Sequence, residues 1–371
     1  MPGPAAGTAH AATTTDVVCL GESMVTFLPS QPGRLADVPS FGRGIGGAES
    51  NVACALAAAG HRAAWVGRVG ADGFGDHLVE TIAGYGVDTS AVRRDPDRPT
   101  GIYFRTATDR GAGAHEVAYY RAGSAASAMS PSNVPYGEVF AGRILHLSGI
   151  TAALSADCLE LLRELTAPRQ GRPLVSFDVN HRPHLWRGGD ASVLLELARR
   201  ADLVFVGEDE AEEAWGIVGA EAIRAALPEP AVVVVKRGSA GATVFASGLR
   251  PGPRSSNAGG AEDAAAGTGS GDTVTVVPAL HVDVVAAVGA GDAFAAGFLS
   301  ATLRGLPVRD RVRHGHLMAA AVLTVPGDLT EPPARDHADR LAALDDGAWG
   351  RLRLGPGWTA ADRASEEVRT S

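Results

Sequence analysis

The sequence predicts an α/β protein with a doubly wound, mostly parallel β-sheet. Short apolar runs rich in β-branched residues recur along the chain, and stretches with helical spacing separate them. This alternation is typical of a parallel sheet with helices on both faces. The predicted strands are 17–20, 64–66, 144–147, 174–177, 203–206 and 232–235, and the predicted helices include 49–59, 74–84, 155–166 and 190–200.

Segments 25–44 and 97–122 interrupt this pattern. In the second, residues 102–105 and 116–121 read as antiparallel strands around a Gly-rich turn, so we expect the two segments to form a small β-sheet lid. The Gly-, Ala- and Ser-rich segment 250–272 predicts a flexible insertion between strands near 242–246 and 273–277. Tails are expected at 1–15 and 351–371, which leaves 16–350 as one domain.

The composition excludes several classes of protein. A net charge of -9 argues against a nucleic-acid or anionic-membrane surface, and no apolar run reaches the roughly 18 residues of a membrane span. The start of the chain lacks the pattern of a signal peptide, so we expect a cytoplasmic protein. The three cysteines match no disulfide or zinc spacing, and we expect them to be buried and reduced.

The motif Gly289-Ala290-Gly291-Asp292 opens an apolar helical run and carries the strongest chemical signal. Glycines and a helix N-terminus direct amide groups toward an anion such as phosphate. A carboxylate repels phosphate, so its presence suggests a base that takes a proton from the group attacking that phosphate. This combination of an anion site and a base suggests phosphoryl transfer to a hydroxyl. The alternative is that the motif is only a helix N-cap after a Gly turn.

A second glycine-rich segment invites another interpretation. Gly42, Gly44 and Gly47 match the G-x-G-x-x-G dinucleotide fingerprint, but the true fingerprint directly follows a strand and this one does not. Instead, the run from Gly46 to Asn51 leads into a helix, where amides and the Asn51 side chain suit sugar hydroxyls. A simple N-cap with glycines remains the alternative.

Polar residues follow three predicted strands at the sheet edge where ligands of parallel α/β proteins bind. Arg182 follows the strand at 174–177 and suits a carboxylate, or is a solvated loop charge. Glu210 follows the strand at 203–206, and its carboxylate could hold Mg²⁺ through water. The alternative is an acidic residue in the first turn of a helix, where the helix dipole favours it. Lys236, with Gly238 and Gly241 after it, ends the run 232–235 and suits nucleotide phosphates.

Together these elements resemble the PfkB (ribokinase-like) carbohydrate kinases over about residues 16–340. The motif 46–51 is similar to the amino-terminal signature of that family, and 288–297 to its carboxy-terminal signature. The segments 21–24, 100–104, 119–127, 178–186 and 326–328 are most similar to 2-keto-3-deoxygluconate kinases. The resemblance implies a three-layer α/β/α ribokinase-like fold with a lid, and an ATP-dependent kinase of a sugar acid.

The resemblance also implies roles for individual residues. Asp292 would be the general base, and the amides of Gly289, Ala290 and Gly291 would stabilise charge on the transferring group. Lys236, Gly238 and Gly241 would lie near ATP, and Glu210 near the waters of Mg²⁺. The sugar site would consist of Gly47, Asn51, Tyr103, Tyr119, Arg121 and Arg182. Arg121 and Arg182 are the cations expected to meet a sugar carboxylate.

Two positions depart from the family pattern. Ala286 stands where the pattern has an Asp that helps to hold a monovalent cation, so activation by such a cation is doubtful. Gly207 replaces the Asn of the N-x-x-E motif, while Glu210 keeps the Glu. Neither departure affects Asp292 or the glycine-containing loop before it, so we expect the protein to be active. The alternatives are a neutral-sugar kinase such as a fructokinase or ribokinase, and a sugar-sensing protein without turnover. Edge strands in the lid predict a homodimer.

Overall fold

The computed structural model describes residues 15–31, 33–106, 116–187, 189–247 and 271–360. Its main sheet has the strand order β14-β13-β12-β11-β10-β9-β1-β4. The parallel strands are β1 (Thr15–Leu20), β4 (Ala63–Val66), β9 (Gly142–Ser148), β10 (Leu174–Asp178), β11 (Leu203–Gly207) and β12 (Val232–Lys236). Strands β13 (Ala242–Ala246) and β14 (Thr273–Val277) form an antiparallel edge. The predicted α/β fold class is therefore confirmed.

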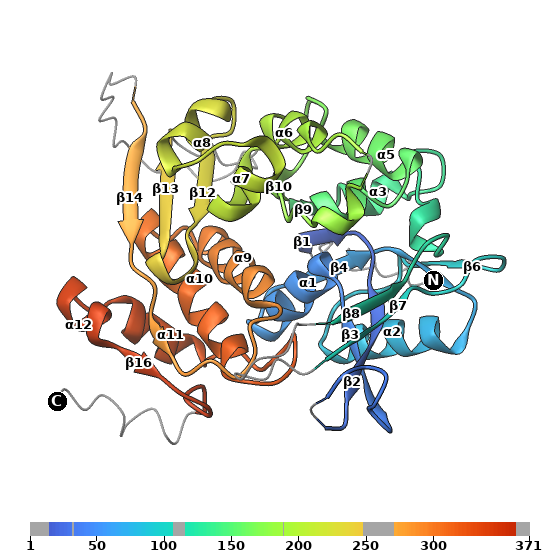
Figure 1. Ribbon diagram of the computed structural model, residues 1–371. Coiled ribbons are helices and arrows are strands. Elements are labelled where there is room, and N and C mark those ends of the chain that lie inside the picture. Colours follow the sequence, from blue (N-terminus) through green and yellow to red (C-terminus); the bar gives the residue numbers. More distant parts are fainter. Residues whose placement is uncertain (1–14, 32, 107–115, 188, 248–270, 361–371) are drawn as a thin grey trace, which may run out of the picture.

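Helices cover both faces of this sheet (Figure 1). Because side chains alternate along a strand, Val232 and Val234 pack into one core while Val233 and Val235 pack into the other. The first core includes side chains of α1 (Ala48–Ala58), α2 (Gly73–Gly84), α9 (Ala290–Leu303), α10 (Val308–Leu323) and α11 (Arg335–Ala342). The second includes those of α3 (Tyr136–Val139), α5 (Ala156–Thr166), α6 (Ser192–Arg199), α7 (Glu208–Trp215) and α8 (Ala220–Ala226).

A small sheet stands beside the main one (Figure 1). It has the order β3-β2-β7-β8 and consists of β2 (Met24–Pro29), β3 (Phe41–Gly46), β7 (Ile102–Arg105) and β8 (Val117–Tyr120). β7 and β8 pair antiparallel, as the sequence predicted. In β7 the buried residues Tyr103 and Arg105 alternate with the less buried Ile102 and Phe104. One face of the small sheet is therefore turned into the protein.

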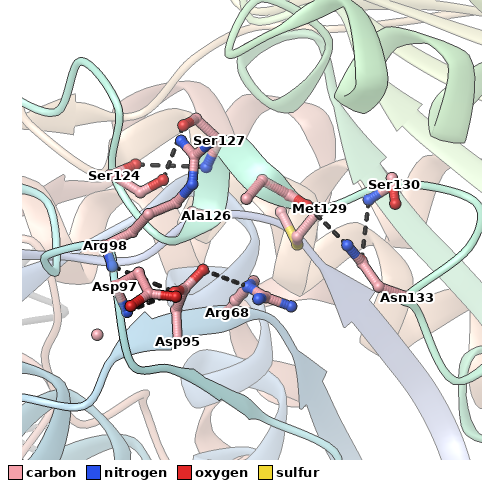
Figure 2. Close-up of polar contacts among 12 residues, drawn as sticks. Arg68, Asp95, Asp97, Arg98, Ser124, Ala126, Ser127, Met129, Ser130 and Asn133 are labelled. Carbon is pink, nitrogen blue, oxygen red and sulfur yellow. Dashed lines mark hydrogen bonds and ion pairs between the residues drawn. The ribbon is translucent and has the colours of Figure 1, made fainter.

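A polar network anchors the chain where it approaches the small sheet (Figure 2). Arg68 in β5 (Arg68–Gly70) donates from Nε to Asp95 Oδ2 at 2.9 Å, and Asp95 ends the neighbouring strand β6 (Arg93–Asp95). Asp95 Oδ1 also accepts the amides of Asp97 and Arg98. These contacts fix the segment that leads into β7.

The predicted start of the C-terminal tail, at residue 351, lies too early in the sequence. Residues 351–360 are packed against the protein: β16 (Arg353–Leu354) pairs with β15 (His281–Val282) after α12 (Asp346–Arg351), and Trp358 is buried. An apolar Trp and two buried leucines within a polar stretch explain the difference. The expected N-terminal tail, apart from Thr15, and nearly all of the insertion at 250–272 lie outside the described residues.

Two further expectations from composition can be compared with the structure. Cys19, Cys54 and Cys158 are free and buried, as expected. Within the described ranges, no helix combines the length and apolar character that crossing a bilayer requires.

Candidate active site

A cavity of about 750 Å³ opens between the small sheet, the carboxyl ends of the parallel strands and the first turns of α1 and α9. This is the edge at which a parallel α/β sheet binds ligands. Of the residues singled out from the sequence, its lining contains Gly47, Asn51, Tyr103, Tyr119, Arg121, Arg182, Glu210, Lys236, Gly289, Gly291 and Asp292. Segments far apart in the sequence thus meet at one site.

Two glycines are required by the backbone of this site. Gly289 has φ 79° at the N-cap of α9, and a Cβ there would lie 2.5 Å from the carbonyl oxygen of Asp328. At the start of α1, a Cβ on Gly47 would lie 2.4 Å from the carbonyl oxygen of Glu22. Both helix N-termini can therefore approach the cavity closely, with their unpaired amides at its wall.

Asp292 lies in the first turn of α9 and is held by α1. Asn51 Nδ2 donates to Asp292 Oδ2 at 2.9 Å, and among the described residues no donor reaches Oδ1. Burial raises the pKa of Asp292 to about 8, and the negative charge of Asp178 adds to this rise. The Asn51 hydrogen bond and the charges of Arg182 and Lys236 oppose it. The carboxyl group can therefore take or give a proton near neutral pH.

Lys236 ends β12 beside the loop that begins α9. Its Nζ contacts both carboxylate oxygens of Asp178, at 3.0 and 3.2 Å, and a Cβ on Gly291 would lie 3.7 Å from Nζ. Burial disfavours the ammonium charge, but nearby carboxylates, Asp178 foremost, outweigh burial and raise the pKa of Lys236. The side chain therefore supplies a permanent positive charge next to Gly291, at the start of α9.

Arg121 is tied to the loop after β1. Its guanidinium forms an ion pair with the buried carboxylate of Glu22, whose other oxygen accepts from Ser124 Oγ at 2.7 Å. Tyr119 lies beneath the guanidinium, with 5.8 Å from its ring centre to Cζ, and stacks on His184 at 4.7 Å. Glu22 thus fixes Arg121 and compensates part of its charge.

Arg182 is much less constrained. Its side chain is 47% exposed, and Nη1 lies 3.6 Å from Glu210 Oε1. The other oxygen of Glu210 accepts the Gly207 amide at 2.7 Å and caps α7. Arg182 is therefore the freer of the two arginines that were expected to bind a carboxylate.

Some expected residues lie outside the cavity lining. Gly238 and Gly241 form the turn after β12, and a Cβ on Gly241 would lie 2.2 Å from the carbonyl oxygen of Val277. Packing against the end of β14 already accounts for Gly241. Ala290 begins α9 between two lining glycines without lining the cavity itself.

Seven other polar residues line the cavity and were not among the site residues predicted from the sequence: Glu22, Arg105, Asp178, Asn180, His184, Arg187 and Asp328. Asp178 and Asn180 had a usable signal, because they follow a predicted strand at the ligand edge. Asn180 also has φ 41°, which is uncommon outside glycine and marks local strain.

Several buried atoms in the cavity wall have no hydrogen-bond partner. Among the described residues, no partner is found for the side-chain oxygens of Asn51 and Asn180, the Nε groups of Arg105 and Arg121, or Nε2 of His184. Buried polar groups are normally paired, so unpaired acceptors and cationic donors around one cavity indicate a polar ligand. Hydroxyl groups suit the two oxygens, and an anion suits the guanidinium groups.

The carboxylates of the site do not form a ready-made metal cage. In the described part of the chain, no three His, Cys, Asp or Glu side chains are grouped to hold a metal ion. Asp178 is engaged by Lys236, and both oxygens of Glu210 face donors. This donor set fits Mg²⁺ held mainly by phosphates and water, with Glu210 at most an outer contact.

Comparison with known proteins agrees with this site. The model of the pfkB family carbohydrate kinases matches residues 14–335. The 2-dehydro-3-deoxygluconokinase of Bacillus subtilis is 34% identical over 328 residues, which cover 86% of this chain and 93% of the relative. The probable fructokinase-6 of Arabidopsis thaliana is 28% identical over 318 residues, 82% of this chain and 75% of the relative.

A solved structure extends the similarity to the fold. The 2-dehydro-3-deoxygluconokinase of Thermotoga maritima superposes with a TM-score of 0.73 at 25% identity, covering 90% of this chain and all of that one. The family model spans residues 14–335, which include each segment that lines the cavity, and the Bacillus relative covers 86% of the chain. The chain therefore belongs to the pfkB family of carbohydrate kinases.

Proposed function

We propose that this protein is an ATP-dependent sugar-acid kinase that phosphorylates the terminal hydroxyl of 2-keto-3-deoxygluconate or a close relative. The observation that carries the proposal is one cavity holding a raised-pKa carboxyl, Asp292, together with the guanidinium groups of Arg121 and Arg182. A neutral sugar needs only hydroxyl partners, whereas a sugar acid needs a cation. The relative from Bacillus subtilis is named for a kinase of this acid.

In the proposed reaction, Asp292 Oδ1 accepts the proton of the sugar's primary hydroxyl. The hydroxyl oxygen forms a bond to the γ-phosphorus while the bond between that phosphorus and the leaving oxygen of ADP breaks. The amides of Gly289, Ala290 and Gly291, at the N-terminus of α9, stabilise charge on the phosphoryl group. The ammonium group of Lys236, beside Gly291, adds to this stabilisation.

The remaining residues take roles that fit their surroundings. Asn51 orients the base through its Nδ2, and its unpaired oxygen suits a sugar hydroxyl, with Gly47 beside it. Tyr103 and Tyr119 extend the sugar site from the small sheet, which would act as a lid. Gly238 and Gly241, in the turn after Lys236, remain candidates for contact with the nucleotide.

We also propose Mg²⁺ as the companion ion of ATP, with Glu210 as an outer contact through water. When bound, Mg²⁺ supplies neutralising charge for the phosphates. We expect no dependence on a monovalent cation, because the buried methyl group of Ala286 offers no oxygen ligand where the family pattern has a carboxylate. We place the activity in the cytoplasm, where ATP is available.

A homodimer formed through the small sheet is part of the proposal. No described strand pairs with its β3 and β8 edges. Aromatic rings gather on the sheet: Phe104 stacks on Phe27 at 4.7 Å and meets Phe41 and Tyr120 edge-on. Tyr120 is 65% exposed. An exposed aromatic side chain beside an open strand edge favours contact with a second copy.

The test is ADP release with Mg-ATP and a panel of 2-keto-3-deoxygluconate, fructose and ribose. Arg182→Ala should raise KM for the keto-acid by about 10- to 100-fold, the effect of losing one charged hydrogen bond. Arg199→Ala, which removes an arginine remote from the cavity, is the matched control. Preference of the wild type for fructose or ribose would favour the neutral-sugar kinase, and absence of turnover with every sugar would favour the sensor.

A further inference from the structure

A buried ion pair joins the small sheet to the core at the edge of the cavity. Arg105 Nη2, on β7, donates to Asp328 Oδ1 at 2.7 Å, and the two side chains are only 4% and 5% exposed. The neighbouring Tyr103 hydroxyl lies 3.3 Å from Asp328 Oδ2. Asp328 lies in the segment after α10, so this contact joins residues more than 200 positions apart.

Asp328 also packs against the loop that begins α9. Its carbonyl oxygen and Cα occupy the space that a Cβ on Gly289 would need, at 2.5 and 3.1 Å. Gly289 in turn accepts the Ala293 amide at 2.9 Å, in the first turn of the helix that carries Asp292. A continuous set of contacts therefore runs from Arg105 through Asp328 to the helix turn that carries the proposed base.

The cost of this pair argues against a purely structural role. Burying an arginine and a carboxylate removes both from water, and such pairs are often no more stabilising than apolar residues of similar size. Burial raises the pKa of Asp328, while the charge of Arg105 and the Tyr103 hydroxyl oppose this rise. In addition, Arg105 Nε is buried at the cavity and finds no hydrogen-bond partner in the part of the chain that the structure describes. An ion pair with this desolvation cost is better explained by a role in holding the site's geometry than by a contribution to stability.

We infer that Arg105 is a positioning residue that, through Asp328, couples the placement of the small sheet to the geometry of the Gly289–Asp292 loop. The inference rests on the proposed function for its kinetic consequence only. A residue that served only to hold the sugar would change KM for the sugar. Because Asp328 supports Gly289, loss of Arg105 should lower kcat as well, since small displacements of a catalytic group are costly.

The first test uses kinetics of three variants with 2-keto-3-deoxygluconate. Arg105→Gln should lower kcat by about tenfold or more, and Arg105→Lys, which keeps the charge without the planar fork, should recover only part of this loss. Arg68→Gln is the matched control, because Arg68 forms an ion pair with buried Asp95 away from the cavity (Figure 2). An unchanged kcat in Arg105→Gln with a raised KM, or equal kcat losses in Arg105→Gln and Arg68→Gln, would overturn the inference.

The second test needs no substrate and separates this inference from the proposed function. Amide hydrogen exchange of the free protein is followed at Ala293 and the next residues of α9. Arg105→Gln should accelerate exchange there by about tenfold, while Arg68→Gln should not. If Arg105→Gln fails to fold, the double variant Arg105→Gln with Asp328→Asn removes both charges together and is measured instead. Unchanged exchange at α9 refutes the coupling whatever the substrate proves to be.

Discussion

Replacing Asp292 by Asn should abolish most activity and at the same time stabilise the protein at alkaline pH. Burial moves the pKa of this carboxyl from 3.8 to about 8. Because the pKa is higher in the folded state, ionisation opposes folding, and the stability that the protonated group contributes is lost as pH rises from about 4 to about 8. At about 1.36 kcal/mol for each pH unit, the rise from 3.8 to about 8 sets an upper limit of about 6 kcal/mol, of which we expect at least about 1 kcal/mol to be measurable.

The assay combines chemical unfolding with kinetics. The free energy of unfolding of Asp292→Asn should exceed that of wild type at pH 9, and the difference should shrink toward pH 5. In the wild type, kcat/KM should rise about tenfold between pH 7 and pH 9, as a base with pKa near 8 loses its proton. In the variant, kcat should fall by about 10²- to 10⁴-fold.

Asp209→Asn is the control for these measurements, because Asp209 is an exposed carboxylate in the first turn of α7. It should change neither the pH dependence nor the activity. The reasoning is refuted if kcat/KM of wild type is flat from pH 7 to pH 9, or if Asp292→Asn is no more stable than wild type at pH 9.

Three other substitutions test separate parts of the site. Lys236→Met removes the positive charge that lowers the pKa of Asp292, so the rising limb of kcat/KM should move to higher pH in a pH titration; an unmoved limb would exclude this coupling. Gly289→Ala places a Cβ at positive φ against a carbonyl oxygen, and denaturant titration should show a loss of about 1 to 2 kcal/mol or more, which a loss below about 0.5 kcal/mol would contradict. Tyr120→Asp should convert the proposed dimer to monomers, as measured by light scattering. The control Val274→Asp, at an exposed valine of β14, should leave the dimer intact. A dimer that persists in Tyr120→Asp would count against the small sheet as the interface.

The strand-and-helix order was predictable from sequence because the signal is local. Apolar runs such as 232–235 fill both cores, and the motif at Gly289–Asp292 combines a turn, a helix start and a carboxylate in consecutive residues. The edge at which the site forms followed from the strand ends, since parallel strands bring their carboxyl ends together.

Partners that are distant in sequence were not predictable. Glu22 and Arg121 are 99 residues apart, and Arg105 and Asp328 are 223 apart. Nothing in the local pattern around Glu22 distinguishes a surface carboxylate from one that neutralises a guanidinium. The expectation that Arg121 and Arg182 meet a sugar carboxylate stays a prediction, and the structure adds a contact that the sequence did not indicate, the ion pair of Arg121 with Glu22.

Because its three cysteines are buried, the rate at which their thiols are labelled can report the unfolding of this protein. Burial raises the pKa of Cys54 to about 12 and that of Cys158 to about 11, and it raises the pKa of Cys19 well above its usual value. Only the thiolate reacts readily with disulfide reagents, so the native chain should be nearly inert toward them. Each thiol that does react records an opening of the core around it, so the labelling rates of Cys19 on β1, Cys54 on α1 and Cys158 on α5 can follow the opening of both cores without an added probe.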